Sequence, residues 1–116
     1  KNMGNISKHF NRVEFACQCG CGFDTVDAET LKYLENIREH FNKPLRITSA
    51  ARCHDHNKSV GGADKSMHKA GRACDIQIDL TAPSDIADYA ESLGLSVGRY
   101  KTFTHIDTRT GLAARW

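Results

Sequence analysis

Residues 66–79 of the chain read Ser66-Met67-His68-Lys69-Ala70-Gly71-Arg72-Ala73-Cys74-Asp75-Ile76-Gln77-Ile78-Asp79. Seven residues of extended chain would separate His68 from Asp75 by roughly 23 Å. If both side chains bind one metal ion, the chain must double back between them, and Gly71 tolerates the backbone angles of such a turn. After the turn, apolar and polar residues alternate as in a β-strand. The pattern therefore predicts that Cys74 and Ile76 face a core and that Asp75 faces the opposite side.

A second segment, Phe103-Thr104-His105-Ile106-Asp107, has the same two-residue period. This period places His105 and Asp107 on one face of a strand and Ile106 on the other. If the two strands are neighbours, Asp75 and His105 point to the same place. We therefore predict that His68, Asp75 and His105 are the three ligands of a catalytic zinc ion, which usually keeps a fourth position open for water. A lone histidine is more often a surface or hydrogen-bonded residue, so the prediction depends on the combination.

The two motifs resemble those of the D-alanyl-D-alanine metallopeptidase family, whose fold is shared with the signalling domain of hedgehog proteins. The string Ser66-x-His68-x-x-Gly71-x-Ala73-x-Asp75 and the later His105-x-Asp107 carry the resemblance. Further segments look like a small phage and bacterial branch of the family: residues 15–22, 47–53, 56–57, 60–63, 97–100, 103–108 and 115–116. The resemblance thus extends over nearly the whole chain.

The resemblance implies an α+β fold in which helices pack on a central antiparallel sheet that carries the zinc site. It also assigns the zinc ligands to His68, Asp75 and His105. Arg52 matches the family arginine that holds a substrate oxygen or the developing oxyanion, a role that suits a fixed, forked guanidinium. The implied reaction is hydrolysis of a peptide bond in the peptidoglycan stem or cross-link, by a D-Ala-D-Ala carboxypeptidase or a murein endopeptidase.

The sequence does not identify the general base. Better-known members of the family often carry an acidic residue shortly before the last histidine ligand, and no carboxylate precedes His105 in this way. Asp107 is the nearest acid, and it either activates the water or orients a ligand. His54, His56 and Tyr100 are weaker alternatives. The missing acid also supports a second hypothesis, a zinc-containing cell-wall-binding module without catalytic activity.

The five cysteines are an odd number, which argues against a fully paired disulfide framework. Cys17, Cys19 and Cys21 are spaced two residues apart. Three alternatives remain for them: reduced thiols in a glycine-rich turn, a second metal site, or a disulfide to Cys53. A third functional hypothesis, a thiol redox or zinc-ribbon protein, depends on the same residues. Cys74 is predicted to lie in the core.

Length and charge are typical of one small domain covering residues 1–116. The net charge of +2, with acids and bases interspersed, gives no electrostatic footprint for nucleic acid. No apolar run approaches the ~20 residues that span a bilayer. The first eight residues lack the apolar core of a secretion signal, so the protein either lacks one or has lost it by processing. We expect a monomer acting at the bacterial cell wall, either a phage lysis or tail domain or a processed bacterial enzyme.

Helical and alternating patterns predict the order of the elements. An irregular arm occupies residues 1–22, and helices are predicted at 27–41, 55–60 and 83–93. Strands are predicted at 45–49, 72–79, 97–100 and 103–107.

Overall fold

The computed structural model describes residues 4–116, so the first three residues of the predicted arm lie outside the described range. The α-helices are α1 (Ala28–Phe41), α2 (His54–Ser59) and α3 (Pro83–Ser92), and the short 3-10 helices are η1 (Arg12–Phe15) and η2 (Met67–Ala70). The strands are β1 (Leu45–Ser49), β2 (Ala73–Ile78), β3 (Ser96–Arg99) and β4 (Thr104–Asp107). The predicted helices and strands are all present, within one or two residues of the expected bounds.

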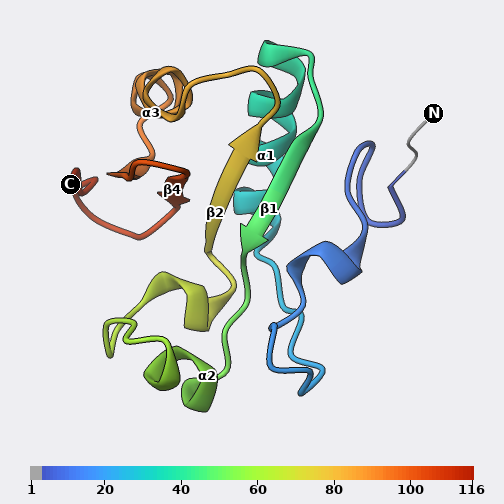
Figure 1. Cartoon of the computed structure of the whole chain (residues 1–116), viewed down its shortest axis with the longest axis vertical. Coiled ribbons are helices and arrows are strands. Elements are labelled where there is room, and N and C mark those ends of the chain that lie inside the picture. Colours follow the sequence, from blue (N-terminus) through green and yellow to red (C-terminus); the bar gives the residue numbers. More distant parts are fainter. Residues whose placement is uncertain (1–3) are drawn as a thin grey trace.

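A four-stranded antiparallel sheet in the order β1-β2-β4-β3 forms the centre of the α+β fold (Figure 1). Strands β2 and β4 are neighbours, and their register pairs Asp75 with His105. Residues directly opposite each other in an antiparallel pair lie on the same face of the sheet. The register therefore sends these two side chains to one face, as the alternating pattern predicted.

Helix α1 begins where Asp27 caps it, because the Asp27 side chain accepts backbone N–H bonds from the first turn. Leu34 and Ile37 on its buried face pack into the core with the sheet, and Asn42 ends the helix in a left-handed conformation. Figure 1 shows α1 behind β1 and β2, with α3 at the other end of the sheet beside β4. Side chains from both α1 and α3 belong to the apolar core on one face of the sheet.

One apolar core lies between the sheet and the helices. Its fully buried aliphatic side chains include Leu34, Ile37, Ile76, Ile86 and Ile106. Cys74 is also part of this core, as predicted, and is 1% exposed. Strands β2 and β4 thus point their odd-numbered and even-numbered side chains to opposite faces, and Asp75 and His105 leave the sheet away from the core.

The amino-terminal arm is irregular apart from η1, yet it contributes two core side chains. Phe10 and Phe15 are fully buried and meet edge to face, with ring centroids 6.0 Å apart. Burying an aromatic side chain of this size stabilises a fold by about 1.5–3 kcal/mol. The carbonyl oxygen of Phe15 also accepts a hydrogen bond from the N–H of Ala51 at 3.1 Å. The arm is therefore tied to the segment that follows β1.

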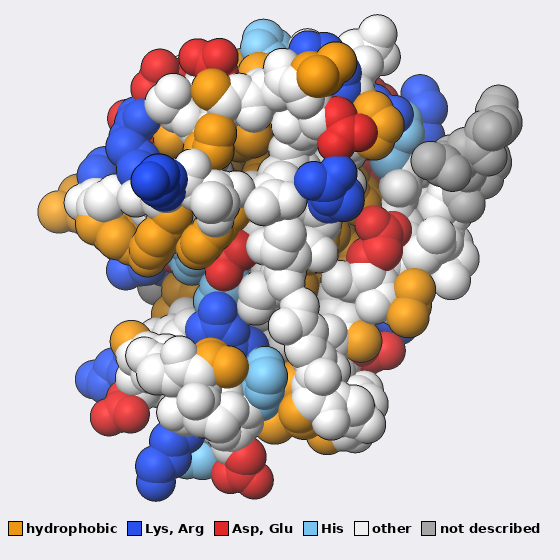
Figure 2. Space-filling model, in the orientation of Figure 1, with side chains coloured by type: hydrophobic (Ala, Val, Ile, Leu, Met, Phe, Trp, Pro, Cys, Tyr) orange, Lys and Arg blue, Asp and Glu red, His pale blue; other side chains and the backbone are white. Residues whose placement is uncertain are grey.

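Acidic and basic side chains are mixed over the face seen in Figure 2. Within residues 4–116, no helix combines the length and the apolar character that a membrane span requires.

Candidate metal centre

A tight turn brings His68 to the start of β2. The Ser66 hydroxyl accepts the N–H of His68 at 3.2 Å and caps η2, and Gly71 ends this helix with φ of 68°. A Cβ atom on Gly71 would lie 2.5 Å from the carbonyl oxygen of Thr25, so a side chain does not fit there. The chain reverses at Gly71, as was predicted from the position of this glycine between His68 and Asp75.

The carboxylate of Asp75 lies between two imidazoles. Its Oδ1 is 3.3 Å from Nε2 of His68 and 3.0 Å from Nδ1 of His105. All three side chains are buried, and one ligand atom from each lies within 4.8 Å of the others. The structure therefore brings together the three residues that the sequence singled out as metal ligands.

The second nitrogen of each imidazole has a partner on the side away from Asp75. Nδ1 of His68 lies 2.7 Å from the carbonyl oxygen of Ala50, and Nε2 of His105 lies 2.8 Å from Oδ2 of Asp107. A carbonyl oxygen only accepts, so His68 donates from Nδ1. In the neutral form of this imidazole, the form that binds metals, Nε2 then carries the lone pair. Metal-bound histidines usually donate their other N–H to such an oxygen. Two nitrogens and one carboxylate oxygen fit the ligand set of zinc.

The electrostatics of the group favour a cation at its centre. Burial raises the pKa of Asp75, but hydrogen bonds from His105 and His68 outweigh it and bring the pKa to about 2. Burial lowers the pKa of His105, but hydrogen bonds to Asp107 and Asp75 outweigh it and raise the pKa. The buried carboxylates of Asp75 and Asp107 thus both contact the His105 imidazole, and they stabilise a positive charge placed beside them.

Asp107 is completely buried and is held by Arg109. The guanidinium of Arg109 donates from Nε to Oδ1 at 2.9 Å and from Nη2 to Oδ2 at 2.7 Å, and its backbone N–H donates to Oδ1 at 3.2 Å. Burial raises the pKa of Asp107, but these bonds and the one from His105 bring it well below the usual range. Both oxygens are occupied, so of the two roles considered for Asp107 the geometry favours orienting His105.

Arg52 lies beside Asp75, with its Nη2 3.5 Å from Asp75 Oδ2. The Arg52 guanidinium also donates from Nε to the Ser49 hydroxyl at 3.3 Å and from Nη1 to Oδ1 of Asn57 at 3.2 Å. A Cβ atom on Gly62 would lie 2.2 Å from that Asn57 oxygen, so the glycine permits the close approach. The guanidinium is therefore held in place beside the three candidate metal ligands.

A cleft of about 580 Å³ opens over these residues. Its lining includes the three candidate ligands and Arg52, and also Tyr100, Phe103, Arg109 and Trp116. In Figure 2 the cleft is the notch at the left side of the molecule, where histidine, acidic and basic side chains meet.

Tyr100 is the one weaker proton-transfer candidate that lines this cleft; His54 and His56 are not part of its lining. Tyr100 stacks on Phe103, with ring centroids 4.4 Å apart, and its hydroxyl oxygen accepts the indole N–H of Trp116 at 2.7 Å. With its oxygen occupied in this way, the Tyr100 hydroxyl is free to donate into the cleft.

Arg109 and Trp116 also line the cleft, and neither was predicted to have a role there. The ring of Trp116 lies 4.9 Å from that of His105, and the guanidinium carbon of Arg109 lies 5.4 Å from the centroid of the Trp116 ring. The two-residue period that relates His105 to Asp107 extends to Arg109 and was a usable signal. The position of Trp116 had no such signal, because it depends on the chain's return beside β3.

A protein-family model described as peptidase M15 matches residues 8–107, which include all three candidate ligands, Arg52 and Asp107. None of the curated proteins compared with the chain matches it.

Proposed function

The chain belongs to the peptidase M15 family, the D-alanyl-D-alanine metallopeptidases, and from this premise we propose that it is a zinc peptidase of bacterial peptidoglycan. The carrying observation is the group of His68, Asp75 and His105 at the floor of a cleft, with the outer nitrogen of each imidazole already bonded. We assign these three residues as the zinc ligands, through Nε2 of His68, a carboxylate oxygen of Asp75 and Nδ1 of His105.

Zinc bound there supplies a Lewis acid that polarises a carbonyl and lowers the pKa of water. The protein's own residues orient this chemistry. The carbonyl of Ala50 and the carboxylate of Asp107 hold the two imidazoles with a lone pair facing Asp75. Asp107 is thus a positioning residue, and its low basicity fits that role better than proton abstraction.

Arg52 and Tyr100 provide donors on the cleft side of the ligands. Arg52 holds the substrate's carboxylate or the oxyanion that develops at the scissile carbonyl, because its guanidinium is fixed beside Asp75 by Ser49 and Asn57. The Tyr100 hydroxyl, which accepts from Trp116, donates its hydrogen to a substrate oxygen.

Peptidoglycan stem peptides carry several carboxylates, and three cationic side chains line the cleft: Arg52, Lys65 and Arg109. This charge supports an acidic peptide as the substrate. In a carboxypeptidase, Arg52 would hold the free terminal carboxylate of the substrate. In an endopeptidase, it would stabilise the oxyanion at the scissile carbonyl. Either substrate places the protein's action at the cell wall, and we expect it to act as a monomer.

A second candidate function is a zinc-containing module that binds the cell wall without cleaving it. One observation favours it: among the described residues that line the cleft, the three ligands are the only histidine or acidic side chains. No free carboxylate or imidazole is therefore placed there to accept a proton from water.

The deciding experiment is incubation of the zinc-loaded protein with purified peptidoglycan and with synthetic stem peptides, followed by mass spectrometry of the products. We expect released D-alanine, or a defined peptide fragment, that disappears with a chelator and returns with added zinc. The fragments identify the bond as D-Ala-D-Ala, L-Ala-D-Glu or a cross-link. Binding to peptidoglycan without any product would reject the peptidase and support the binding module.

A further inference from the structure

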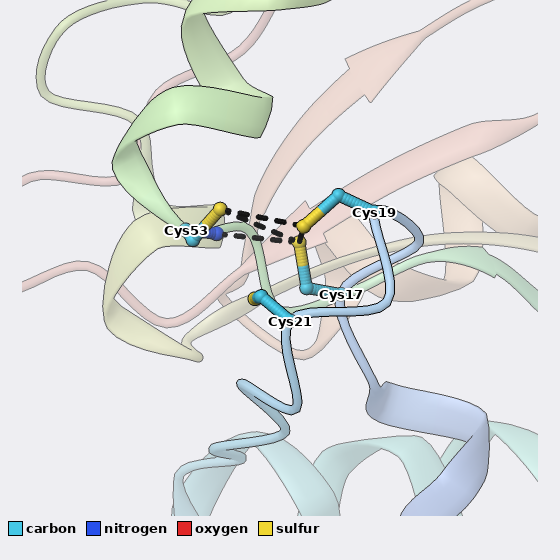
Figure 3. Close-up of side chains that lie close together, drawn as sticks. All are labelled: Cys17, Cys19, Cys21 and Cys53. Atoms are coloured by element: carbon cyan, nitrogen blue, oxygen red, sulfur yellow. Dashed lines mark hydrogen bonds between the residues drawn. The ribbon is translucent and has the colours of Figure 1, made fainter.

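Four cysteines from two segments that are distant in the sequence meet at the start of α2. Cys17, Cys19 and Cys21 come from the loop after η1, and Cys53 lies at the start of α2 (Figure 3). Their four sulfur atoms lie within 4.8 Å of one another. All of them are free thiols in the structure, as is the buried Cys74.

The sulfur spacing matches that of one tetrahedral metal ion. Four sulfurs at the usual Zn–S distance of about 2.3 Å form a tetrahedron with edges of about 3.8 Å. The Cys17–Cys19, Cys19–Cys53 and Cys17–Cys53 sulfur distances are 3.5, 3.6 and 3.8 Å. A disulfide bond would need about 2.05 Å between two of these atoms.

The loop is shaped to turn three alternate cysteines toward one point. In an extended strand, side chains two residues apart share a face but stand roughly 7 Å apart. Gly20 and Gly22 adopt φ of 83° and 91°, and the N–H of Gly20 bonds to the Cys17 carbonyl at 3.1 Å. These turns curl the loop, so its sulfurs come closer together than a strand allows.

Backbone donors already face the sulfurs. The N–H of Cys53 points at Sγ of Cys17 at 3.4 Å, and the N–H of His56 points at Sγ of Cys53 at 3.4 Å. Such donors stabilise negative charge on sulfur, and metal sites are commonly supported by hydrogen bonds of this outer kind.

We propose that Cys17, Cys19, Cys21 and Cys53 bind a second, structural zinc ion. Four thiolates fill the tetrahedron and leave no open position, which is the arrangement of structural rather than catalytic zinc. This proposal does not depend on the proposed peptidase activity.

The position of the site gives it a bracing role. Cys53 directly follows Arg52, and the Ala50 carbonyl three residues before it bonds to His68. The neighbouring Ala51 N–H bonds to Phe15 in the arm. Zinc bound to these cysteines would therefore hold the arm against the segment that positions one cleft ligand and the cleft arginine.

The test is the metal content of protein purified under reducing conditions, with X-ray absorption at the zinc edge. We expect two zinc ions per chain in the wild type and one in Cys19→Ser/Cys21→Ser, whose serines replace exposed cysteines. His68→Ala should also keep one zinc, now surrounded by four sulfurs at about 2.3 Å. Cys74→Ala is the matched control, because it removes the cysteine outside the group, and it should retain two.

If a variant does not fold, the X-ray absorption spectrum of the wild-type protein still tests the proposal. Zinc in both sites would show sulfur ligands from the cysteines together with nitrogen and oxygen ligands from the cleft. One zinc per chain without sulfur ligands would overturn the proposal. Iron in the cysteine group, or a mass showing disulfides among these cysteines in the reduced preparation, would overturn it too. Loss of cleft zinc alone would instead contradict the proposed peptidase.

Discussion

Nε2 of His105 lies 2.8 Å from Oδ2 of Asp107, two residues further along β4. Asp107 in turn accepts two hydrogen bonds from the Arg109 guanidinium, one from Nε and one from Nη2. The carboxylate therefore fixes which nitrogen of His105 carries a hydrogen and which faces Asp75. With His105 as the proposed zinc ligand, Asp107 acts on the metal through this imidazole, and its removal should change metal affinity before it changes chemistry.

Asp107→Asn should weaken zinc binding in the cleft about 10- to 100-fold, because a neutral amide supports the imidazole less strongly. At saturating zinc, most of the peptidase activity should return. Competition with a chelator measures the affinity, and product release at several zinc concentrations measures the activity.

Asp88→Asn is the control for this change, since Asp88 is an exposed partner of Arg99 and does not line the cleft. Its zinc affinity should equal that of the wild type. If Asp107 were instead the general base, Asp107→Asn would keep its zinc and lose kcat by about 10²- to 10⁴-fold. That result would reject the positioning role.

Arg52→Lys should lower kcat/KM by about 10²- to 10³-fold with zinc content unchanged, because a lysine keeps the charge but loses the fork that meets two oxygens. Arg46→Lys, on an exposed residue of β1 paired with Asp79, should have no effect. Since Arg52 also contacts Ser49 and Asn57, urea unfolding must show that the variant is folded. Full activity in Arg52→Lys would contradict a forked contact with substrate.

Local patterns predicted most of the fold because each one reports a single physical cause. Alternation in β2 and β4 separated Cys74 and Ile106 from Asp75 and His105. The structure confirms this, because the first two residues belong to the apolar core and the other two do not. Asp27 marked the start of α1 through its capping side chain. The burial of Phe10 and Phe15 was not predicted, because an irregular segment has no period that tells which residues face the core.

The candidate metal centre was predictable where spacing along the chain carries the geometry. A turn at Gly71 and the two-residue period of β4 were enough to bring His68 and His105 toward Asp75. A link between Cys53 and the three earlier cysteines was considered only as a disulfide. Cys53 lies 36 residues after Cys17 and 34 after Cys19, and no local pattern predicts that two segments so far apart in the sequence meet. The same reason hid the packing of Trp116 against His105.

Glu35→Gln should lower the free energy of unfolding by about 1–3 kcal/mol at neutral pH, since the Glu35 carboxylate is bonded to the Ser7 hydroxyl and to two nitrogens of His9. Burial raises the pKa of Glu35, but these bonds outweigh it and lower the pKa. The stabilisation is therefore full above the unfolded-state pKa of about 4.3 and is lost as pH falls through the lower folded-state value.

Urea unfolding of the wild type and Glu35→Gln at a series of pH values measures this loss, and the difference between the two should shrink below about pH 4. Both proteins keep His68, Asp75 and His105, so their difference isolates Glu35. Asp24→Asn, which removes an exposed partner of Arg12, is the control and should show almost no difference at any pH. A Glu35 effect that is constant with pH would contradict an ionised, hydrogen-bonded carboxylate.

Gly71→Ala should destabilise the fold by about 3 kcal/mol or more and weaken zinc binding in the cleft, because two effects combine at this turn. Its φ of 68° disfavours a side chain, and the new Cβ would lie 2.5 Å from the Thr25 carbonyl oxygen. Gly111→Ala separates the effects, since Gly111 has φ of 82° with nothing within 4 Å, and it should lose only about 1 kcal/mol. Thermal unfolding and chelator competition measure both variants. Equal losses would mean that the contact with Thr25 does not hold His68 to Asp75.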